Sequence, residues 1–555
     1  MSRVTAAAIV LVLGLCLVAV FTGCNGGPGR VVTFHDANLE AAIRDQLNLP
    51  EGDIYTSQLA HLSELEADYR EIRDLRGLEY CSNLQKLDLS RNYISDLSPL
   101  ANLGNLVELN LNYNQIADLS PLASLPNLAG LGLWHNQVRD VSPLANLTNL
   151  VGLDLAENEV RIIAQLAHLT NLRVLSLADN EVSDISALAS LTELTWLGLE
   201  KNKVSDVSPI AGLTALEVLG LWDNEIDDVS PLANLTDLKV LSLGENEISD
   251  ISALADLTGL ETLALGDNEV SDISSLAGLT GLTELRIAGN QVSDISPLAG
   301  LTDLRVLSIA ANEVSDISPL ANLAGLEVLN IWKNEISDIS PLAGLTGLRE
   351  LRISENRIQD VSHLQGFSNL KVLSLADNLV SDIAHLGNLT GLEILSLGEN
   401  KISDVGPLAG LTGLKELGLG GNNIADIAAL SNLPMLKRLS LDRNQITDIG
   451  ALSDLTDLIV LWLDDNDIVD ISPLSGLHKL GEVGESTDWW LEERGDTKIC
   501  LGLSNNQIAD IGPLVDNEGL QEGDGIDLRG NPLSLDSLEI YLPQLQGRGV
   551  AVLRD

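Results

Sequence analysis

Leucine, isoleucine and valine recur in this chain with a period of 22 residues, and one asparagine marks each period. These asparagines run from Asn92 to Asn466 in eighteen copies without a change of spacing. In the copy that begins at Leu84, which we number as position 1, Leu87 and Leu89 are two residues apart. Side chains at this spacing lie on the same face of a β-strand. The period therefore predicts one short strand per 22 residues, with positions 4 and 6 inward and positions 3, 5 and 7 outward.

The rest of each period predicts a compact turn back to the next strand. Asn92 and Ile94 direct the chain inward again, and Ser98 followed by Pro99 resembles a capped helical start. About six residues then remain before the next strand, so a 3₁₀ turn fits better than an α-helix. One coil cannot bury its apolar interior alone, but stacking against its neighbours buries it.

The motif L-x-x-L-x-L-x-x-N-x-I at a fixed period in the twenties resembles leucine-rich repeats. The resemblance implies an α/β fold, a right-handed solenoid of stacked coils. Its parallel strands would lie on the concave face and its short 3₁₀ turns on the convex face.

Two polar columns accompany the leucines, and we interpret both as structural. The asparagine at position 9 can donate and accept hydrogen bonds, so it suits the unpaired backbone groups of a buried turn. The aspartate at position 13, from Asp96 to Asp470, is suited to accept from backbone N–H groups beside a turn. A calcium ladder is the alternative for the aspartates. Calcium takes roughly six to eight oxygens, however, and one carboxylate per coil does not supply them.

Both ends of the array depart from the period and predict caps, which a solenoid needs to cover its open ends. Residues 33–63 form the predicted N-terminal cap, in which Asp36 can cap an amphipathic helix and a second short helix is expected over 54–65. The repeats follow over 64–531 as about 21 coils. Residues 532–555 predict a C-terminal cap with a closing helix and a final strand.

A small helical cap followed by 22-residue repeats that carry I-S-D-I-S-P-L-A-x-L-T resembles internalin-type bacterial surface proteins. The resemblance covers nearly all of the chain that would remain after export. It implies a binding function and does not specify a ligand. No wall-sorting tail and no added module follow the predicted C-terminal cap, which favours a lipid anchor over attachment to the cell wall.

The first residues predict export from the cytoplasm. A short basic start precedes an apolar run from Val4 to Val20, which is typical of a signal peptide. Phe21-Thr22-Gly23-Cys24 then resembles the end of a bacterial lipoprotein signal. We therefore interpret 1–23 as a signal peptide, Cys24 as the lipidation site and 24–32 as a flexible tether. A cut secretory peptide and an uncut anchor are the alternatives, and all three interpretations place the repeats outside the cytoplasm, at the bacterial cell surface or membrane-anchored.

The chain is strongly acidic, with a formal net charge of −48 over 555 residues. This charge argues against nucleic acid or an anionic bilayer surface as a direct partner. It is compatible with a cationic protein partner, or with solubility alone. We expect a monomer that contacts the membrane through the lipid anchor only.

No constellation of residues in the sequence predicts catalysis. The seven histidines are scattered, and none stands at metal-ligand spacing with a cysteine or another histidine. His363 and His385 align on adjacent coils but lack a third ligand. Cys81 and Cys500 are too many coils apart for a disulfide. We therefore predict a non-enzyme with no catalytic residue, no metal and no cofactor.

Tryptophan indicates a binding face. Five of the seven tryptophans occupy outward strand positions, and two lie in an insertion near 481–498 that interrupts the period. Because tryptophan is enriched at binding hot spots, the predicted ligand-binding residues are Trp134, Trp196, Trp222, Trp332, Trp462, Trp489 and Trp490. The alternative is that each indole shields a neighbouring glycine of the sheet, for which Gly132 and Gly220 are suitably placed.

The flank of the strands, at positions 8 and 10, is acidic over several coils. Its acidic pairs are Glu157/Glu159, Asp179/Glu181, Asp223/Glu225, Glu245/Glu247 and Asp267/Glu269. A run of charges is commonly a solvated surface, whereas a functional run would steer a cationic partner.

These features predict a non-enzymatic cell-surface binding protein, an adhesin or a receptor, that contacts a protein through its concave face. Indole rings also stack on sugar rings, so glycan binding is the second hypothesis. A passive structural role in the cell envelope is the third.

Overall fold

The computed structural model describes residues 29–482, 492–494 and 497–555. The predicted signal peptide, Cys24, residues 24–28 of the predicted tether, and Trp489 and Trp490 lie outside the described residues. The chain divides into two compact units, Met1–Leu282 and Thr283–Asp555. Stacked coils of the predicted length make up both units.

Ten short strands of the first unit pair in parallel, each with the strand one coil further along. Leu87 lies beside Leu109, and Leu109 beside Leu131, so the register follows the sequence period. The strands are β1 (Glu64–Glu66), β2 (Lys86–Asp88), β3 (Glu108–Asn110), β4 (Gly130–Gly132), β5 (Gly152–Asp154), β6 (Val174–Ser176), β7 (Trp196–Gly198), β8 (Val218–Gly220), β9 (Val240–Ser242) and β10 (Thr262–Ala264).

The second unit continues the same pattern and adds a small hairpin. Its parallel strands are β11 (Glu284–Arg286), β12 (Val306–Ser308), β13 (Val328–Asn330), β14 (Glu350–Arg352), β15 (Val372–Ser374), β16 (Ile394–Ser396), β17 (Glu416–Gly418), β18 (Arg438–Ser440), β19 (Val460–Trp462), β22 (Leu501–Gly502), β23 (Gly525–Asp527) and β24 (Ala551–Leu553). In the insertion, β20 (Glu492–Arg494) and β21 (Thr497–Ile499) pair antiparallel. The predicted solenoid of parallel strands is confirmed in each unit.

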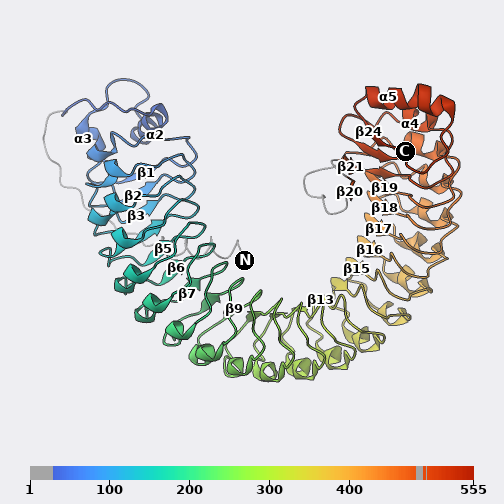
Figure 1. Cartoon of the computed structure of the whole chain (residues 1–555), viewed down its shortest axis with the longest axis horizontal. Helices are drawn as coiled ribbons and strands as arrows, with labels where there is room; N and C mark the ends of the chain where they lie inside the picture. The colour runs from blue at the N-terminus through green and yellow to red at the C-terminus, as the bar shows by residue number, and fades with distance from the viewer. Residues whose placement is uncertain (1–28, 483–491, 495–496) are drawn as a thin grey trace. The chain divides into compact units, whose positions relative to one another are not determined.

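Within each unit the strands lie along one side of the coils and 3₁₀ turns lie along the opposite side (Figure 1). The first unit holds η1 (Leu78–Tyr80), η2 (Ser98–Leu100), η3 (Ser120–Ser124), η4 (Ser142–Leu144), η5 (Ala164–His168), η6 (Ser186–Ser190), η7 (Ser208–Ile210), η8 (Ser230–Asn234), η9 (Ser252–Leu254) and η10 (Ser274–Gly278). The second holds η11 (Ser296–Gly300), η12 (Ser318–Asn322), η13 (Ser340–Gly344), η14 (Ser362–Leu364), η15 (Ala384–Asn388), η16 (Gly406–Gly410), η17 (Ala428–Asn432), η18 (Gly450–Leu452) and η19 (Ser472–Gly476). The preference for 3₁₀ turns over α-helices is confirmed.

The aspartate at position 13, and not the serine at position 15, caps these turns. Ser98 is the first residue of η2 and makes no side-chain cap, which corrects the capped start predicted there. Asp96 Oδ1 instead accepts from the Ser98 N–H at 2.8 Å, and Asp338 accepts from Ser340 in the same way at 2.8 Å. This backbone hydrogen bond lowers the pKa of Asp338. The structural interpretation of the column is confirmed.

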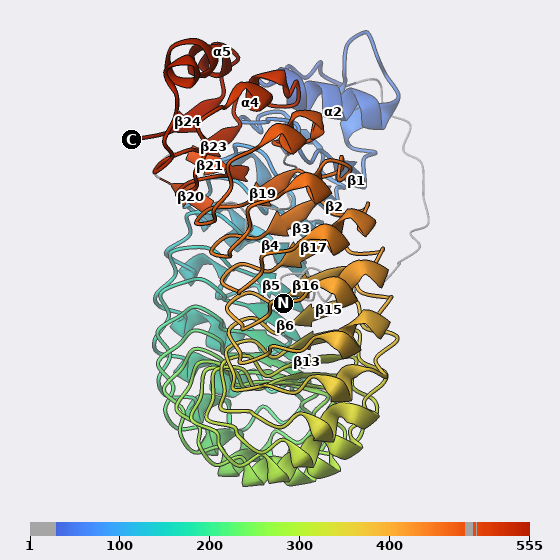
Figure 2. The same cartoon turned by 90° about the vertical axis from the view of Figure 1, so that its right-hand side faces the viewer.

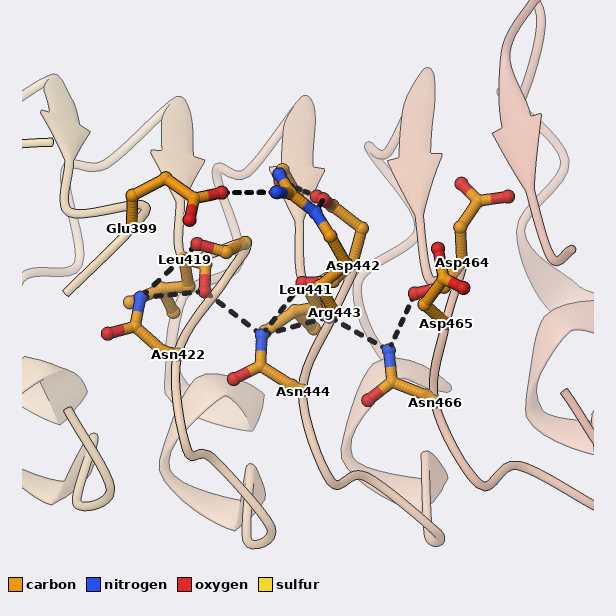
Figure 3. A network of polar contacts seen from close by, with 12 residues as sticks. Glu399, Leu419, Asn422, Leu441, Asp442, Arg443, Asn444, Asp464, Asp465 and Asn466 are labelled. Carbon is orange, nitrogen blue, oxygen red and sulfur yellow. Dashed lines mark hydrogen bonds and ion pairs between the residues drawn. The ribbon is translucent and has the colours of Figure 1, made fainter. Parts of the chain in front are cut away.

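The asparagine at position 9 joins neighbouring coils. Asn444 Nδ2 donates to the carbonyl oxygens of Leu419, Leu441 and Asp442 at 3.0, 3.1 and 3.1 Å, and its Oδ1 accepts from the Ile424 N–H at 3.0 Å. Figure 3 shows the same arrangement at the neighbouring asparagines of the column. Buried backbone groups that would otherwise lack partners are thereby paired. The structural interpretation of this column is also confirmed.

Short caps stand at the two ends of the array. Helix α2 (Ala37–Leu47) begins at Asp36, whose Oδ1 accepts from the Asn38 and Leu39 N–H groups at 2.9 and 3.2 Å, which confirms the predicted cap. Helix α3 (Thr56–Leu59) is shorter than predicted because the chain enters β1 directly afterwards. At the other end lie α4 (Gly512–Asp516), a π-helical turn (Ser537–Tyr541), α5 (Leu542–Gly547) and the last strand β24 (Figure 2).

Candidate functional site

The outward positions 3, 5 and 7 of the coils form what we call the strand face. Over β1 to β6 this face contains a groove. Its lining includes Gly130, Gly132 and Gly152, which leave the sheet backbone bare, and the indole of Trp134. Asp154 also lines the groove, and burial raises its pKa to about 6 although the Ala156 N–H donates to it at 3.1 Å.

Trp134 belongs to an aromatic cluster at the edge of this groove. Its ring meets Tyr113 edge-on, with 4.6 Å between ring centroids and an interplanar angle of 61°. Tyr113 also packs on His135 at 4.7 Å, and the Arg91 guanidinium lies 5.7 Å from the Tyr113 ring. The sequence reasoning missed Tyr113. Position 8, which Tyr113 and His135 share in adjacent coils, carries the signal that could have found it.

Position 8 has an unusual backbone conformation that the sequence pattern did not reveal. Residues at this position adopt positive φ, for example 55° at Arg91, 52° at Lys201 and 51° at Arg443. Bulky β-branched side chains strain this left-handed region, and none occupies the position in these coils. The charged flank therefore lies on a sharp bend that directs its side chains away from the apolar core.

Trp196 is nearly covered, with 7% of its surface exposed, although it stands at an outward position of β7. Its indole lies over Gly198: a Cβ at Gly198 would be 2.6 Å from Trp196 Cη2. Glu200 approaches the backbone of Gly198 as well, because a Cβ there would be 2.8 Å from Glu200 Oε2, and a Cβ at Gly220 would be 2.0 Å from Glu200 Oε1. Burial raises the pKa of the Glu200 carboxyl.

Trp222 stands one coil further, at position 7. A Cβ at Gly244 would lie 2.9 Å from Trp222 Cδ1, so this indole also covers a glycine. Lys201 Nζ lies 5.6 Å from the centroid of the Trp222 ring. Two indoles thus shield glycines, but the shielded glycines are Gly198 and Gly244 and not the Gly132 and Gly220 suggested by the sequence. Gly132 faces the Asn110 and Asn112 amides, and Gly220 faces Glu200.

The two tryptophans of the strand face in the second unit have different surroundings. Trp332 is 38% exposed, and its Nε1 donates to Glu355 Oε1 at 3.1 Å. Lys333 Nζ lies 5.8 Å from the Trp332 ring centroid. Trp462 belongs to β19 and lies in register between Ser440 and Gly502. Within each unit, the described indoles therefore stand on different coils.

The acidic flank differs along its length. In the earlier coils its carboxylates have basic partners: Glu157 meets His135 Nδ1 at 2.7 Å, and Glu181 meets Arg161 at 2.8 Å and Lys203 at 3.4 Å. Beside β8 to β10 a set of six flank carboxylates forms no ion pair with any described residue. This set is Asp223, Glu225, Glu245, Glu247, Asp267 and Glu269.

No arrangement for metal binding occurs in the part of the chain that the structure describes. His363 Nε2 stands 3.9 Å from Asp360 Oδ2 without further ligands. Cys81 and Cys500 are free thiols, and burial raises the pKa of each to about 12. Across the described ranges, no helix has the length and apolar character to cross a membrane.

Sequence matches agree with this geometry. Residues 104–146, 148–190, 236–278, 280–322, 325–366, 368–410, 390–432, 412–454 and 434–476 match the family described as Leucine Rich repeats (2 copies). Residues 83–103 match the single Leucine Rich Repeat, and the matches together span more than half of the chain. The chain belongs to the leucine-rich repeat family. No curated protein matches the sequence of this leucine-rich repeat protein.

Several solved leucine-rich repeat structures are similar to it. The ectodomain of the Arabidopsis receptor kinase HAESA, solved with an extended IDA peptide hormone ligand, is 25% identical, with a TM-score of 0.62 over 86% of this chain and 84% of that chain. A leucine-rich repeat protein of Leptospira interrogans is 25% identical, with a TM-score of 0.50 over 71% of this chain and 93% of that one. An internalin of Listeria monocytogenes is 28% identical over 79% of this chain and 96% of its own, with a TM-score of 0.36.

Proposed function

We propose that this leucine-rich repeat protein is a non-enzymatic cell-surface binding protein, an adhesin or a receptor, whose strand face contacts a protein partner. The observation that carries the proposal is the set of indoles on that face. Trp134, Trp222 and Trp332 retain exposed surface on the side of the sheet away from the leucine core. Partly exposed tryptophans on a bare sheet are typical anchors of a protein interface.

The groove over β1 to β6 supports the same proposal. It offers a glycine-lined hollow beside the Tyr113–Trp134 pair, which suits an inserted side chain or a length of extended chain. The HAESA ectodomain, which shares this fold, was solved with a peptide hormone. A peptide or an exposed loop of a protein is therefore the ligand class that we assign to the strand face.

The place of action is part of the proposal. We assign 1–23 as a signal peptide and Cys24 as a lipid-bearing residue that holds the repeats outside the cytoplasm, on the motif Phe21-Thr22-Gly23-Cys24. Mass spectrometry of the membrane-extracted protein should show an acylated N-terminal cysteine. A Cys24→Ala chain found in the same membrane fraction as the native chain would remove this assignment.

A capture experiment tests the binding proposal. The native chain and a Trp196→Ala/Trp222→Ala/Trp332→Ala variant are incubated with envelope and neighbouring-cell extracts, and captured proteins are purified for direct affinity measurement. An Ile162→Ala/Val469→Ala variant is the matched control, because it removes exposed apolar side chains away from the strand face. We expect the tryptophan variant to lose at least about tenfold in affinity and the control to keep it. Equal affinities would place the site elsewhere.

Glycan recognition is the second candidate. It is favoured by the lining of the groove, where the Trp134 indole lies among the carboxylates and amides of Asp88, Asn110 and Asn112. Binding to a glycan array that Trp134→Ala abolishes, without any captured protein, would establish this candidate instead. Absence of binding in both experiments would leave a passive envelope role.

A further inference from the structure

Glu200 has an exceptional position on the strand face. In the regular coils from Ser90 to Gly420 it is the one acidic residue at position 7. Its carboxylate lies against the backbone of two adjacent strands, since a Cβ would lie 2.0 Å from Oε1 at Gly220 and 2.8 Å from Oε2 at Gly198. The carboxylate therefore depends on glycine at both places, and it lies close to the sheet instead of extending into solvent.

The polar atoms at this place lack partners. Neither Glu200 Oε2 nor the Nε1 of the almost covered Trp196 has a hydrogen-bond partner among the described residues. The nearest lysine along the chain, Lys201, pairs with Asp179 Oδ2 at 3.7 Å, and its Nζ lies 5.6 Å from the centroid of the Trp222 ring. A buried donor and a buried carboxylate oxygen without partners are costly in a folded protein, so each calls for an explanation.

Two indoles accompany this carboxylate. Trp196 shares the bare backbone of Gly198 with Glu200, and Trp222 occupies the position of Glu200 in the next coil. The neighbouring residues of the strand face, Val174 and Val218, carry no charge. An ionised carboxylate near indole rings is the chemistry that holds an ammonium or guanidinium group, because the charge pair and the cation–π attraction act on the same cation.

We propose that Trp196, Glu200 and Trp222 form a site for the lysine or arginine side chain of a polypeptide segment lying on the strand face of the first unit. This site rests on the proposed protein-binding function and specifies the chemistry of the partner. The six flank carboxylates without ion pairs beside β8 to β10 lie next to it along the chain. They attract a cationic segment towards the site, whereas the paired carboxylates of the earlier coils are already neutralised.

Synthetic peptides test the site directly. Arrays of ten-residue peptides carry lysine or arginine at the centre, and matched arrays carry norleucine or citrulline there, which keep the shape and remove the charge. Binding to the purified chain is measured by calorimetry and by tryptophan fluorescence. Among the peptides that bind, we expect those with lysine or arginine to have about tenfold higher affinity than their neutral counterparts.

Three variants make the test specific. Glu200→Gln keeps the shape and should abolish the preference for charge, and Gly220→Ala should weaken it by displacing the carboxylate. Glu193→Gln is the control, because it makes the same charge change at an exposed residue at the end of the preceding coil, outside the strand face. Circular dichroism verifies that each variant folds.

The outcomes separate this inference from the proposed function. Peptides that bind equally well with or without the central charge, or a preference that survives Glu200→Gln, would overturn the cation site and leave the protein-binding face standing. No peptide binding by the native chain, together with no captured protein, would overturn both. Equal loss in Glu200→Gln and Glu193→Gln would show general electrostatic attraction and would also remove the site.

Discussion

Two regions of the strand face carry the same kinds of side chain, but the acidic residues of one form ion pairs and Glu200 in the other forms none with a described residue. Around β7 and β8, Glu200 Oε2 and Trp196 Nε1 have no hydrogen-bond partner within the described ranges. Around β18 and β19, Asp442 accepts from Ser440 Oγ at 2.5 Å and from Arg443 Nε at 3.0 Å, and Arg443 also pairs with Glu399 (Figure 3). Composition alone therefore does not show whether an acidic side chain of the strand face has an ion-pair partner.

The difference comes from basic or hydroxyl side chains of the same coil or of an adjacent coil. Asp464 accepts from the Ser504 N–H and hydroxyl at 2.9 and 2.6 Å, and Arg438 meets Glu416 at 2.5 Å. Glu200 has Gly198 at the place of Ser440, and glycine offers no side-chain donor; Lys201, at the place of Arg443, lies 3.7 Å from Asp179 Oδ2. A sheet can carry a carboxylate on its surface with or without an ion-pair partner. Only a carboxylate without such a partner, as at Glu200, keeps its charge available to a ligand.

The largest expected effect tests the compensated region. Arg438 is 5% exposed, so Arg438→Ala leaves the Glu416 carboxylate covered and unpaired, and we expect a loss of about 3 kcal/mol in the free energy of unfolding. Glu200→Gln should cause no loss, because it removes a charge that forms no ion pair with any described residue. Urea unfolding of both variants measures the contrast. Replacing both members of the pair, as in Arg438→Met/Glu416→Leu, should recover most of the stability, and equal losses in Arg438→Ala and Glu200→Gln would contradict the comparison.

The next effect compares two glycines that face a carboxylate at the same distance. A Cβ at Gly502 would lie 2.0 Å from Asp464 Oδ2, and a Cβ at Gly220 would lie 2.0 Å from Glu200 Oε1. Asp464 is tied down by hydrogen bonds, so Gly502→Ala should cost about 2 kcal/mol. Gly220→Ala should cost less than about 0.5 kcal/mol because the Glu200 side chain can swing aside. Thermal unfolding of the Gly502→Ala and Gly220→Ala variants measures the two losses. Gly152→Ala is the reference, because a Cβ at Gly152 would meet open space.

The smallest expected effect is a loss of stability in acid, and it should be the same in both units. The Ser252 and Ser340 N–H groups lower the pKa of Asp250 in the first unit and Asp338 in the second. Because the pKa of each aspartate is lower in the folded state than its ordinary value of 3.8, the ionised carboxylate stabilises the fold at pH values above 3.8. This contribution is lost as the pH falls through the lower pKa of the folded state. We therefore expect the melting temperature to fall between about pH 4 and pH 2.

Aspartate-to-asparagine variants isolate this column. Asn retains an acceptor oxygen for the same N–H group and does not titrate, so Asp250→Asn and Asp338→Asn should each flatten the acid limb slightly and equally. Melting curves of the two variants between pH 7 and pH 2 provide the measurement. A marked difference between the two variants would show that the two units differ in more than their strand faces.

Much of the fold could be predicted because every coil repeats the same physical problem. The spacing of Leu87 and Leu89 gave the strand, and the asparagine column gave the pairing of backbone groups between coils. The cap of η2 was assigned to the wrong residue, because Ser98 and Asp96 are both plausible caps by composition and only the backbone path selects Asp96. The second helix of the N-terminal cap was placed over too many residues, since strand pairing takes over at β1.

The candidate site could be predicted only in part. Outward tryptophans follow from the period, but the cover over Trp196 and the partners of Trp332 do not. Glu200 was not recognised at all, since a single glutamate among many acidic residues carries no signal in the sequence. Its setting depends on Gly198 in its own coil and on Gly220 in the next.

The sequence by itself determined the coil, the register and the face on which each residue stands, because the backbone repeats its hydrogen bonds every 22 residues. Only the tertiary structure decided which outward side chains meet and which stand without a partner. A long side chain at position 7 reaches into the adjacent coil, and what it contacts there depends on residues of that coil, such as Gly220 for Glu200 and Gly244 for Trp222. Physically, the repeat specifies the backbone scaffold, whereas the pairing of charges and indoles on its surface is a property of each pair of neighbouring coils.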